Sequence, residues 1–510
     1  MPPWWLYASL ALLLRCVFII KTLRLLLSFR WGVSLWPHSG QGVAPMFGDY
    51  EAQRHWMEVT TNLPLSEWYE QTPSNDLLYW GLDYPPLTAY HSFALGHASN
   101  MINSSWTALH SSRGEESSQH RLFMRATVLV TDLLLLLPAT QMVALGRKEV
   151  VAAMLSLPPL ILIDHGHFQY NSASLGLFLL AVAALMRGRD LTGSALFVLA
   201  LNYKQMELYH ALPFFFYLLG LCWKQPNITT RITKLSAIGA TVVCTFAFIW
   251  APFILVGPES VLQVLKRCFP FGRGLFEDKV ANFWCSLDVV MKLRHSLSIP
   301  ELAKLSGAAT FFLALPSNLH LMARPTISNL VLSLTSTALA FFLFSFQVHE
   351  KSILLAVVPA VLLYGEAPSL RTTLPWFITV ATFSMLPLLT KDGLLLPSVA
   401  LSVLHLTLMH NLSDLLPKAV DPRRPQSPIP SLPPTTAELL LKATMVISLF
   451  GCIVITILSV TVAPPAKYPF LWPLVASVYG AAHFLLFFIY LLYLQIFATP
   501  SLPSPSKKTN

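Results

Sequence analysis

Charged residues are scarce in this chain of 510 residues, of which only 12% are Asp, Glu, Lys or Arg. Soluble domains carry about 25%. Hydrophobic residues make up 54% of the chain, and the mean hydropathy is +0.58. This composition excludes disordered, coiled-coil and collagen-like chains and leaves an integral membrane protein as the class that fits. The net charge of +9 then indicates basic cytoplasmic loops instead of a nucleic-acid partner.

Several motifs are also missing. The sequence contains no Walker loop, no GxGxxG motif and no HExxH motif, which disfavours a soluble domain that binds a nucleotide sugar. Its six cysteines show no CxxC spacing, so a zinc or redox motif is not expected. Cys268 and Cys285 share one polar loop and could form a disulfide if that loop is luminal, although free thiols are the favoured interpretation.

Long apolar runs dominate what is present. A membrane-spanning helix needs about 20 mostly apolar residues, and the runs predict an all-α polytopic membrane protein with about 14 transmembrane helices. The first run contains Lys21, Arg24 and Arg30, so its boundaries stay open, with one helix plus an interfacial stretch as an alternative. The runs lie near 5–36, 122–145, 150–165, 171–187, 190–204, 207–222, 234–257, 304–321, 327–346, 352–365, 373–389, 394–410, 438–462 and 470–497.

The loops between these runs alternate in character. One set is short and basic, and excess Lys and Arg marks the cytoplasmic side of a membrane. This set consists of 146–148, 187–189, 223–234, Arg324 and the Pro-rich stretch 412–437. The other set is polar, acidic and aromatic, and we expect it in the lumen. It consists of 37–121, 164–171, 204–210, 258–303, 347–351 and the turn at 391–392.

Three regions follow from this alternation. Residues 1–411 are expected to form a transmembrane catalytic module with luminal loops, and 412–437 a Pro-rich cytoplasmic linker. Residues 438–510 are expected to form C-terminal transmembrane helices and a cytoplasmic tail. Its Lys507 and Lys508 have the form of a dilysine retrieval signal of the endoplasmic reticulum. Of the three glycosylation sequons, only that at Asn103 is expected to face the lumen.

The first luminal loop places Asp49 and Glu51 directly after Gly48 and close to the first span. Carboxylates at a membrane boundary are candidate general bases, because a low dielectric raises their pKa. The competing interpretation is a helix cap with a solvated first turn. In that helix Arg54 would pair with Glu51, three residues earlier.

Two further blocks combine polar and aromatic residues. Asp83 and Tyr84 precede a diproline and resemble a sugar-contacting arrangement, with a rigid turn as the equally weighted alternative. His165 and His167 offer ligands for a metal, but a hydrogen-bonded luminal turn that faces an oligosaccharide is favoured, and no metal site is predicted. Gln169 belongs to the same block.

The remaining candidates are cationic. Lys204 either pairs with Glu207, which is slightly favoured, or faces an anion. Arg273 lies between two glycines in a loop that suits a lid over a polar substrate, or an interfacial segment. His349 and Lys351 lie between two spans and can hold a phosphate whose lipid tail stays in the bilayer. An ordinary basic helix end is the alternative.

Six blocks of this chain resemble those of the dolichyl-phosphate-glucose-dependent α-1,3-glucosyltransferase family of endoplasmic-reticulum N-glycan precursor assembly. They are FGDYEAQRHW, WGLDYPPLTAYHS, DHGHFQYNS, YKQMELYHALPFF, RGLFEDKVANFWC and FLFSFQVHEKSIL. The first block is most similar to members that add the first glucose to Man9GlcNAc2-diphospho-dolichol, with members that add the second glucose as the alternative. Residues 16–30 look inserted relative to the family's compact first helix.

The resemblance implies a GT-C type glycosyltransferase of the endoplasmic-reticulum membrane, with a luminal active site, cytoplasmic termini and no cofactor. Its substrates would be dolichyl-phosphate-glucose and a lipid-linked oligosaccharide within membrane lipid. Asp49 is the expected general base, and His349 the expected contact to the donor phosphate, helped by Lys351 and Arg273. The expected contacts to the acceptor or sugars are Glu51, Asp83, Tyr84, His167 and Gln169.

A lipid or glycolipid transporter is the competing class, because many spans and charges at the membrane edge would suit it. Transporters often carry broken helices at matching places in two halves, and no such pair is evident in the sequence. The polar residues also gather on one face of the membrane instead of its midplane. Both observations favour the enzyme.

Overall fold

The computed structural model describes residues 27–269, 280–364, 368–415 and 436–498. Within these residues the only β pairing is an isolated bridge between Thr72 and Asn75, so the predicted all-α class is confirmed. Five predicted features lie wholly or mostly outside the described residues: the first apolar run, the stretch 16–30 that looks inserted, Arg273, the Pro-rich linker and the dilysine tail.

The helices follow the predicted apolar runs closely. Residues 27–34 are helical. The helices that follow are α2 (Gly48–Asn62), α3 (Pro86–Ile102), α4 (Ser118–Thr131), α5 (Leu137–Ala144), α6 (Lys148–Leu155), α7 (Pro158–Ile161), α8 (Asn171–Met186), α9 (Asp190–Tyr203), α10 (Ala211–Trp223), α11 (Ile228–Val256), α12 (Pro258–Cys268), α13 (Phe283–Met291), α14 (Leu293–Ser296), α15 (Ile299–Ala323), α16 (Ile327–Phe344), α17 (Leu354–Leu362), α18 (Pro368–Ser384), α19 (Leu386–Lys391), α20 (Leu395–Leu415), α21 (Thr436–Thr461) and α22 (Leu471–Tyr493).

Shorter turns link several of these helices. They are η1 (Leu65–Glu67), η2 (Ser104–Thr107), η3 (Asp132–Leu136), η4 (Leu162–Phe168), η5 (Gln205–His210), η6 (Glu350–Ile353) and η7 (Leu494–Ala498). Of these, η3, η4 and η7 are wider, π-helical turns. Such turns inside a longer helix frequently occur at functional sites.

Seven helical segments among the described residues are long and apolar enough to cross a membrane. Other predicted runs form shorter helices, such as α9 with 14 residues and α17 with 9. At 1.5 Å per residue these helices are shorter than a bilayer core. The seven candidate spans are Ser118–Ala144, Lys148–Phe168, Ile228–Val256, Ile327–Phe344, Leu395–Leu412, Leu439–Thr461 and Leu471–Phe497.

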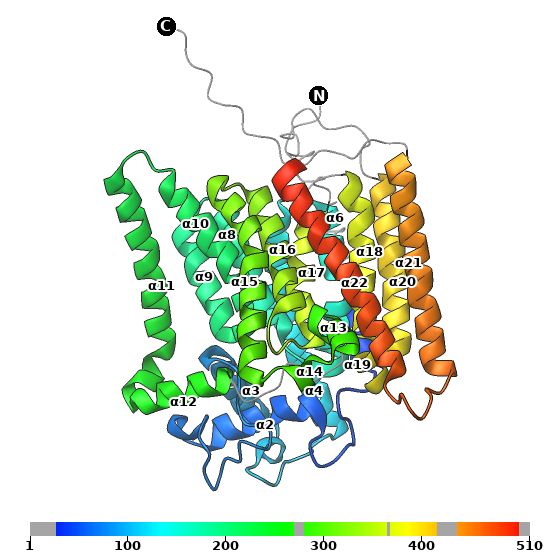
Figure 1. Ribbon diagram of the computed structural model, residues 1–510. Coiled ribbons are helices and arrows are strands. Elements are labelled where there is room, and N and C mark those ends of the chain that lie inside the picture. The colour runs from blue at the N-terminus through cyan, green and yellow to red at the C-terminus, as the bar shows by residue number, and fades with distance from the viewer. Residues whose placement is uncertain (1–26, 270–279, 365–367, 416–435, 499–510) are drawn as a thin grey trace, which may run out of the picture.

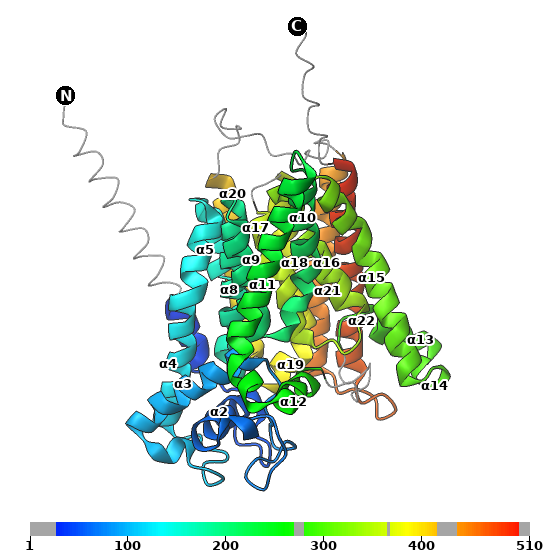
Figure 2. The same ribbon diagram turned by 90° about the vertical axis from the view of Figure 1, so that its left-hand side faces the viewer.

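The helices stand side by side in one bundle, and α2 and α12 lie across one end of it (Figure 1). The view turned by 90° places α2, α3 and α12 at that same end (Figure 2). We call this end the α2 end. The loop between α10 and α11 lies at the opposite end. There the Lys234 ammonium pairs with Asp190 at 2.6 Å. Two of the predicted basic loops, 187–189 and 223–234, therefore lie close together at the end opposite the α2 end.

The interior of the bundle is one large apolar cluster with contributions from most of the helices between α5 and α22. A small polar group also ties helices together: the Ser317 hydroxyl donates to the Gln495 side chain at 2.6 Å, and the Ser333 hydroxyl lies 2.9 Å from it. Small polar residues of this kind commonly join helices inside membranes. By contrast, α11 and α21 keep only 17% of their apolar windows buried, as expected of helices that face lipid.

Cys268 ends α12 as a buried free thiol. The disulfide with Cys285 that the sequence left open is therefore not formed, and the favoured interpretation of Cys268 as a free thiol agrees with the structure.

Candidate active site

Asp49 lies in the first turn of α2, and one of its carboxylate oxygens contacts three polar side chains. Its Oδ2 atom accepts a hydrogen bond from Gln169 Nε2 at 2.6 Å and from Lys351 Nζ at 2.7 Å, and lies 3.0 Å from His167 Nε2. These partners are 118 to 302 positions away in sequence. The Asp49 side chain keeps 23% of its surface exposed, so a ligand can reach the carboxylate.

Each segment that brings a side chain to Asp49 contains a residue in the left-handed backbone region. Phe47 has φ of 52°, Phe168 of 86° and Gln347 of 57°. Bulky residues rarely adopt this conformation, and where they do it often marks a functional site. At Phe168, the last residue of the π-helical turn η4, the reversal allows its neighbours His167 and Gln169 to point to the same carboxylate.

His167 is held between two carboxylates. Its Nδ1 atom lies 2.5 Å from Asp392 Oδ2, while its Nε2 atom faces Asp49. Asp392 is buried directly after α19. The sequence analysis placed Asp392 in a luminal turn but gave it no role. That luminal position was the only signal for Asp392, because its partner His167 is 225 residues away.

Lys204 belongs to the same hydrogen-bond network. Its Nζ atom donates to Gln169 Oε1 at 3.1 Å and to Asn171 Oδ1 at 2.8 Å, and lies 4.8 Å from the centre of the Tyr84 ring. The slightly favoured pairing with Glu207 is wrong. Lys204 has an extended backbone between α9 and η5, and its ammonium bonds Gln169 and Asn171 instead of Glu207.

Glu207 instead bonds His210 at 2.7 Å. Burial lowers the pKa of the Lys204 amino group to about 8, although the nearby Asp164 carboxylate opposes this shift. Lys204 is therefore a second cation beside Asp49 that the sequence analysis did not favour.

The pKa of Asp49 differs from the expectation. Burial by itself raises the pKa of this carboxyl, but the charges and hydrogen bonds of Lys351 and His167 outweigh burial and hold the pKa well below its ordinary range. The expected rise at a membrane boundary is therefore wrong, because the sequence did not reveal that Lys351 lies 2.7 Å away. Asp49 is ionised at neutral pH.

Glu51 does not reach the site. It is fully buried, and its carboxylate accepts hydrogen bonds from Arg54 at 2.6 and 2.7 Å and from the Tyr79 hydroxyl at 2.8 Å. Arg54 also pairs with Glu58 at 2.6 Å. The predicted pairing of Arg54 with Glu51 along the helix is confirmed. The predicted contact between Glu51 and a sugar is not supported, because no face of Glu51 is open.

The other predicted residues are placed as follows. Tyr84 lies beside Lys204, and the half-buried Asp83 precedes it. Pro85 and Pro86 lead into α3, as expected of a rigid turn. His349 is half-buried at the start of η6, two residues before Lys351.

The two histidines of the predicted metal motif have different partners. His165 Nε2 lies 2.7 Å from Asp132 Oδ2, whereas His167 lies between Asp49 and Asp392. The two rings therefore do not converge on one ligand. The described part of the chain contains no group of three or more His, Cys, Asp or Glu side chains arranged to hold a metal ion.

Comparison with known proteins shows which family the chain resembles. The pattern of the ALG6, ALG8 glycosyltransferase family matches residues 13–490. The chain is 48% identical over 488 residues to a dolichyl pyrophosphate Man9GlcNAc2 alpha-1,3-glucosyltransferase of Gallus gallus, covering 92% of this chain and 94% of that protein. It is 40% identical over 481 residues to a probable enzyme of the same name from Arabidopsis thaliana, covering 92% and 88%. The chain therefore belongs to the ALG6, ALG8 glycosyltransferase family.

Proposed function

We propose that this chain is an inverting glucosyltransferase that moves glucose from dolichyl-phosphate-glucose to the terminal mannose of Man9GlcNAc2-diphospho-dolichol in α-1,3 linkage. This would be the first glucose of the N-glycan precursor. The names of its relatives support the acceptor. The observation that carries the chemistry is the partly exposed carboxylate of Asp49, which accepts a hydrogen bond from the half-buried cation Lys351 at 2.7 Å.

The proposal includes the location and the full architecture. The chain would be a GT-C type enzyme of the endoplasmic-reticulum membrane, with about 14 spans and cytoplasmic termini. The α2 end would face the lumen. The separation of the basic loops from the Asp49 site supports this orientation.

The reaction needs one base. The glucose of the donor is β-linked to phosphate and the product bond is α, so one inversion at the anomeric carbon suffices. The mannose 3-oxygen forms the new bond to that carbon while the bond from the carbon to the phosphate oxygen breaks. Phosphate already leaves readily, unlike the leaving groups of hydrolases that use two carboxylates. Asp49 would take the proton from the mannose hydroxyl.

Cations stabilise the departing phosphate. Lys351 and His349 are our candidates, with Arg273 as a third. In the structure the Lys351 ammonium is bound to Asp49. A donor phosphate would draw this ammonium away, and the pKa of Asp49 would rise towards that of a better base. Donor binding would thus prepare the base for the acceptor.

The sugars would contact the residues around the carboxylate. His167 and Gln169 hold Asp49 by hydrogen bonds and would orient it towards the mannose hydroxyl. Tyr84 offers an aromatic face beside Lys204, and Asp83 a neighbouring carboxylate. These roles need no cofactor.

A transfer assay tests the proposal. The purified full-length chain is given dolichyl-phosphate-glucose in the presence of a chelator, with either the unglucosylated nine-mannose lipid-linked glycan or its monoglucosylated form. Mass spectrometry detects an added hexose. We expect a gain on the first acceptor only. A gain on the second acceptor only would reassign the chain to second-glucose addition. No gain on either with folded protein would refute the proposal and favour a lipid or glycolipid transporter.

A further inference from the structure

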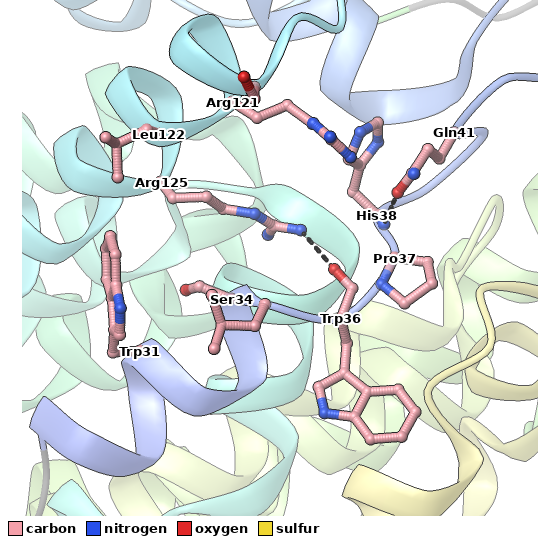
Figure 3. Close-up of a pocket in the computed structure, with 11 residues that line it drawn as sticks. Trp31, Ser34, Trp36, Pro37, His38, Gln41, Arg121, Leu122 and Arg125 are labelled. Atoms are coloured by element: carbon pink, nitrogen blue, oxygen red, sulfur yellow. Dashed lines mark hydrogen bonds between the residues drawn. The ribbon is translucent and has the colours of Figure 1, made fainter.

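A second cavity, of about 320 Å³, opens beside the Asp49 site between the first described helix and α4. Figure 3 shows the guanidinium groups of Arg121 and Arg125 extending from α4 towards the segment that carries Trp36 and His38. A water molecule occupies about 30 Å³ of liquid, so the cavity has room for a group as large as a diphosphate. The question is which chemistry its walls would recognise.

The α4 wall carries two cations, Arg121 and Arg125, and neither forms an ion pair among the described residues. The Arg121 guanidinium also has no hydrogen-bond partner there, and the charge of Glu116 acts on it from beyond ion-pair distance. Arg125 is only 5% exposed and donates to backbone carbonyls alone, those of Trp36 at 3.3 Å, Gly166 at 3.1 Å and His165. Buried charges are usually paired, so this wall favours an anionic ligand.

The opposite wall contains an unsatisfied histidine. His38 is 2% exposed, its Nδ1 atom donates to the Ser39 carbonyl at 3.3 Å, and its ring stacks on Tyr50. Its Nε2 atom has no hydrogen-bond partner within the described ranges. A phosphate in the cavity would favour the protonated ring, which would then donate from Nε2.

One carboxylate opposes an anion at this place. Glu116 Oε1 lies 3.8 Å from His38 Nε2, and its other oxygen accepts a hydrogen bond from the Gly42 backbone at 3.0 Å. The cavity therefore has two guanidinium charges against one carboxylate. Its net charge is positive. Substitution of the carboxylate should therefore change the affinity for an anion in the opposite direction to substitution of an arginine.

The rim of the cavity is apolar and exposed. Leu35 is 74% exposed, Leu122 56% and Trp36 37%, and α4 belongs to a candidate membrane span. Exposed Trp and Leu beside Arg are typical of the level of lipid headgroups. This combination suits a phosphate that is attached to a lipid chain better than a free phosphate in solution.

The cavity and the Asp49 site share a wall. The backbone N–H of Ser39 donates to the His167 carbonyl at 3.1 Å, and the Ser39 hydroxyl accepts from the Asp49 backbone at 3.4 Å. One segment of chain thus separates His38, in the cavity, from Asp49 and Lys351. A reaction between two phosphate-bearing lipids needs two phosphate sites, and Lys351 serves only one.

We infer that the cavity of Arg121, Arg125 and His38 binds the phosphate of a membrane lipid, and we assign it to the diphosphate of the lipid-linked acceptor. The assignment to the acceptor rests on the proposed function. The glycan between the diphosphate and the reacting mannose would then arch over the α2 end to reach Asp49.

Kinetics of the purified full-length chain test the assignment. In Arg121→Gln we expect the KM for the lipid-linked acceptor to rise about tenfold, the scale of one lost charge-assisted hydrogen bond, with donor KM and kcat unchanged. In Glu116→Gln the acceptor KM should fall. Arg113→Gln is the matched control, because Arg113 is exposed in the loop that precedes α4 and does not line the cavity.

A second probe isolates the diphosphate. A short polyisoprenyl diphosphate without sugar should inhibit the wild type competitively against the acceptor, and Arg121→Gln should be about tenfold less sensitive. A binding measurement compares thermal stabilisation by nanodiscs of phosphatidylserine, whose headgroup has a net negative charge, with nanodiscs of phosphatidylcholine, whose phosphate is balanced by a cation. Stabilisation by phosphatidylserine that is lost in Arg121→Gln, with unchanged acceptor kinetics, would support a site for an anionic lipid headgroup but reassign it to a bilayer phospholipid.

The inference is overturned if Arg121→Gln and Glu116→Gln show the same values as Arg113→Gln in all three measurements. These are the KM for the acceptor, the inhibition by the diphosphate probe and the thermal stabilisation by phosphatidylserine. This result differs from a failure of the proposed function. In that case the wild type transfers no glucose at all, while the thermal stabilisation by phosphatidylserine, which needs no turnover, still reports on the cavity.

Discussion

At the scale of single residues, the arrangement around Asp49 separates the carboxylate that reacts from those that maintain the fold. Asp49 is reachable and ionised, whereas Glu51 and Glu58, on the same helix, are buried against Arg54. Asp392 and Asp132 are likewise buried against histidines. Asp49 is therefore the carboxylate on which the loss of activity should depend.

Asp49→Asn should lower kcat by about 10²–10⁴-fold, the usual contribution of a general base, because the amide cannot accept the mannose proton. The asparagine is isosteric, so the fold should persist, but the thermal unfolding midpoint should fall because Lys351 loses its paired carboxylate. Glucose transfer by the purified variant measures the effect, and Asp76→Asn, in the segment between α2 and α3, is the control. Turnover near the wild-type rate would remove Asp49 from the mechanism.

The pH dependence should report the bond between Lys351 and Asp49. The acid limb of kcat/KM follows the pKa of the free enzyme's base. In the wild type this limb should lie at low pH, because Lys351 and His167 outweigh burial and hold the pKa of Asp49 well below its ordinary value. In Lys351→Gln burial is opposed less, so the pKa of Asp49 rises and the limb moves to higher pH.

The control for this profile is Lys391→Gln, which removes an exposed lysine next to Asp392. Its acid limb should coincide with that of the wild type. An unmoved limb in Lys351→Gln would mean that Lys351 does not set the ionisation of Asp49.

At the scale of helices and turns, most elements were predictable and the contacts between them were not. The apolar run 234–257 predicted the core of α11, and 438–462 predicted α21 almost to the residue, because hydrophobic length is local information. The direction of Lys204 was not predictable in this way. It depends on an extended residue between α9 and η5 and on Gln169 from another helix end.

The candidate site shows the same division. The blocks shared with known enzymes identified Asp49, His167, Gln169 and Lys351. The structure brings these four together. Glu51 belongs to the strongest block but faces the inside of its own loop. Membership in a block therefore did not distinguish a catalytic side chain from one that stabilises the loop. The role of each side chain depends on whether its face of the helix is covered by other residues.

The turn before α2 is the element with the tightest backbone packing near the site. Gly48 has φ of 69°, and a Cβ atom there would collide with the backbone carbonyl of Ser39. Gly48→Ala should therefore displace Asp49, lower kcat and reduce the free energy of unfolding by at least about 1 kcal/mol. Transfer rates and thermal unfolding measure both effects.

Gly239→Ala is the matched control for this substitution. Gly239 lies inside α11, and nothing stands within 4 Å of the added methyl group. Alanine there should raise helix stability by about 0.8–1 kcal/mol and leave transfer unchanged. A Gly48→Ala enzyme as active and as stable as Gly239→Ala would contradict the close packing of the turn.

At the scale of the whole molecule, the two ends of the bundle should face different compartments. Asn103 is exposed in the loop that follows α3, whereas Asn227 begins α11 at the opposite end. Only a luminal sequon is glycosylated. In cells we expect one N-glycan, seen as a mobility shift on removal by a glycosidase, that is lost in Asn103→Gln and kept in Asn227→Gln. The reverse pattern would invert the proposed orientation.

The path of the chain through the site also affects how the protein is made. His167 and Asp49 are synthesised early, but His167 keeps its position through Asp392, and Asp49 is bound by Lys351. A nascent chain in which Lys351 and Asp392 have not yet been synthesised and inserted has an incomplete site. During biogenesis, the lipid-linked donor would therefore meet an inert protein until most helices are inserted. A premature stop before Asp392 would leave a membrane-bound product without activity.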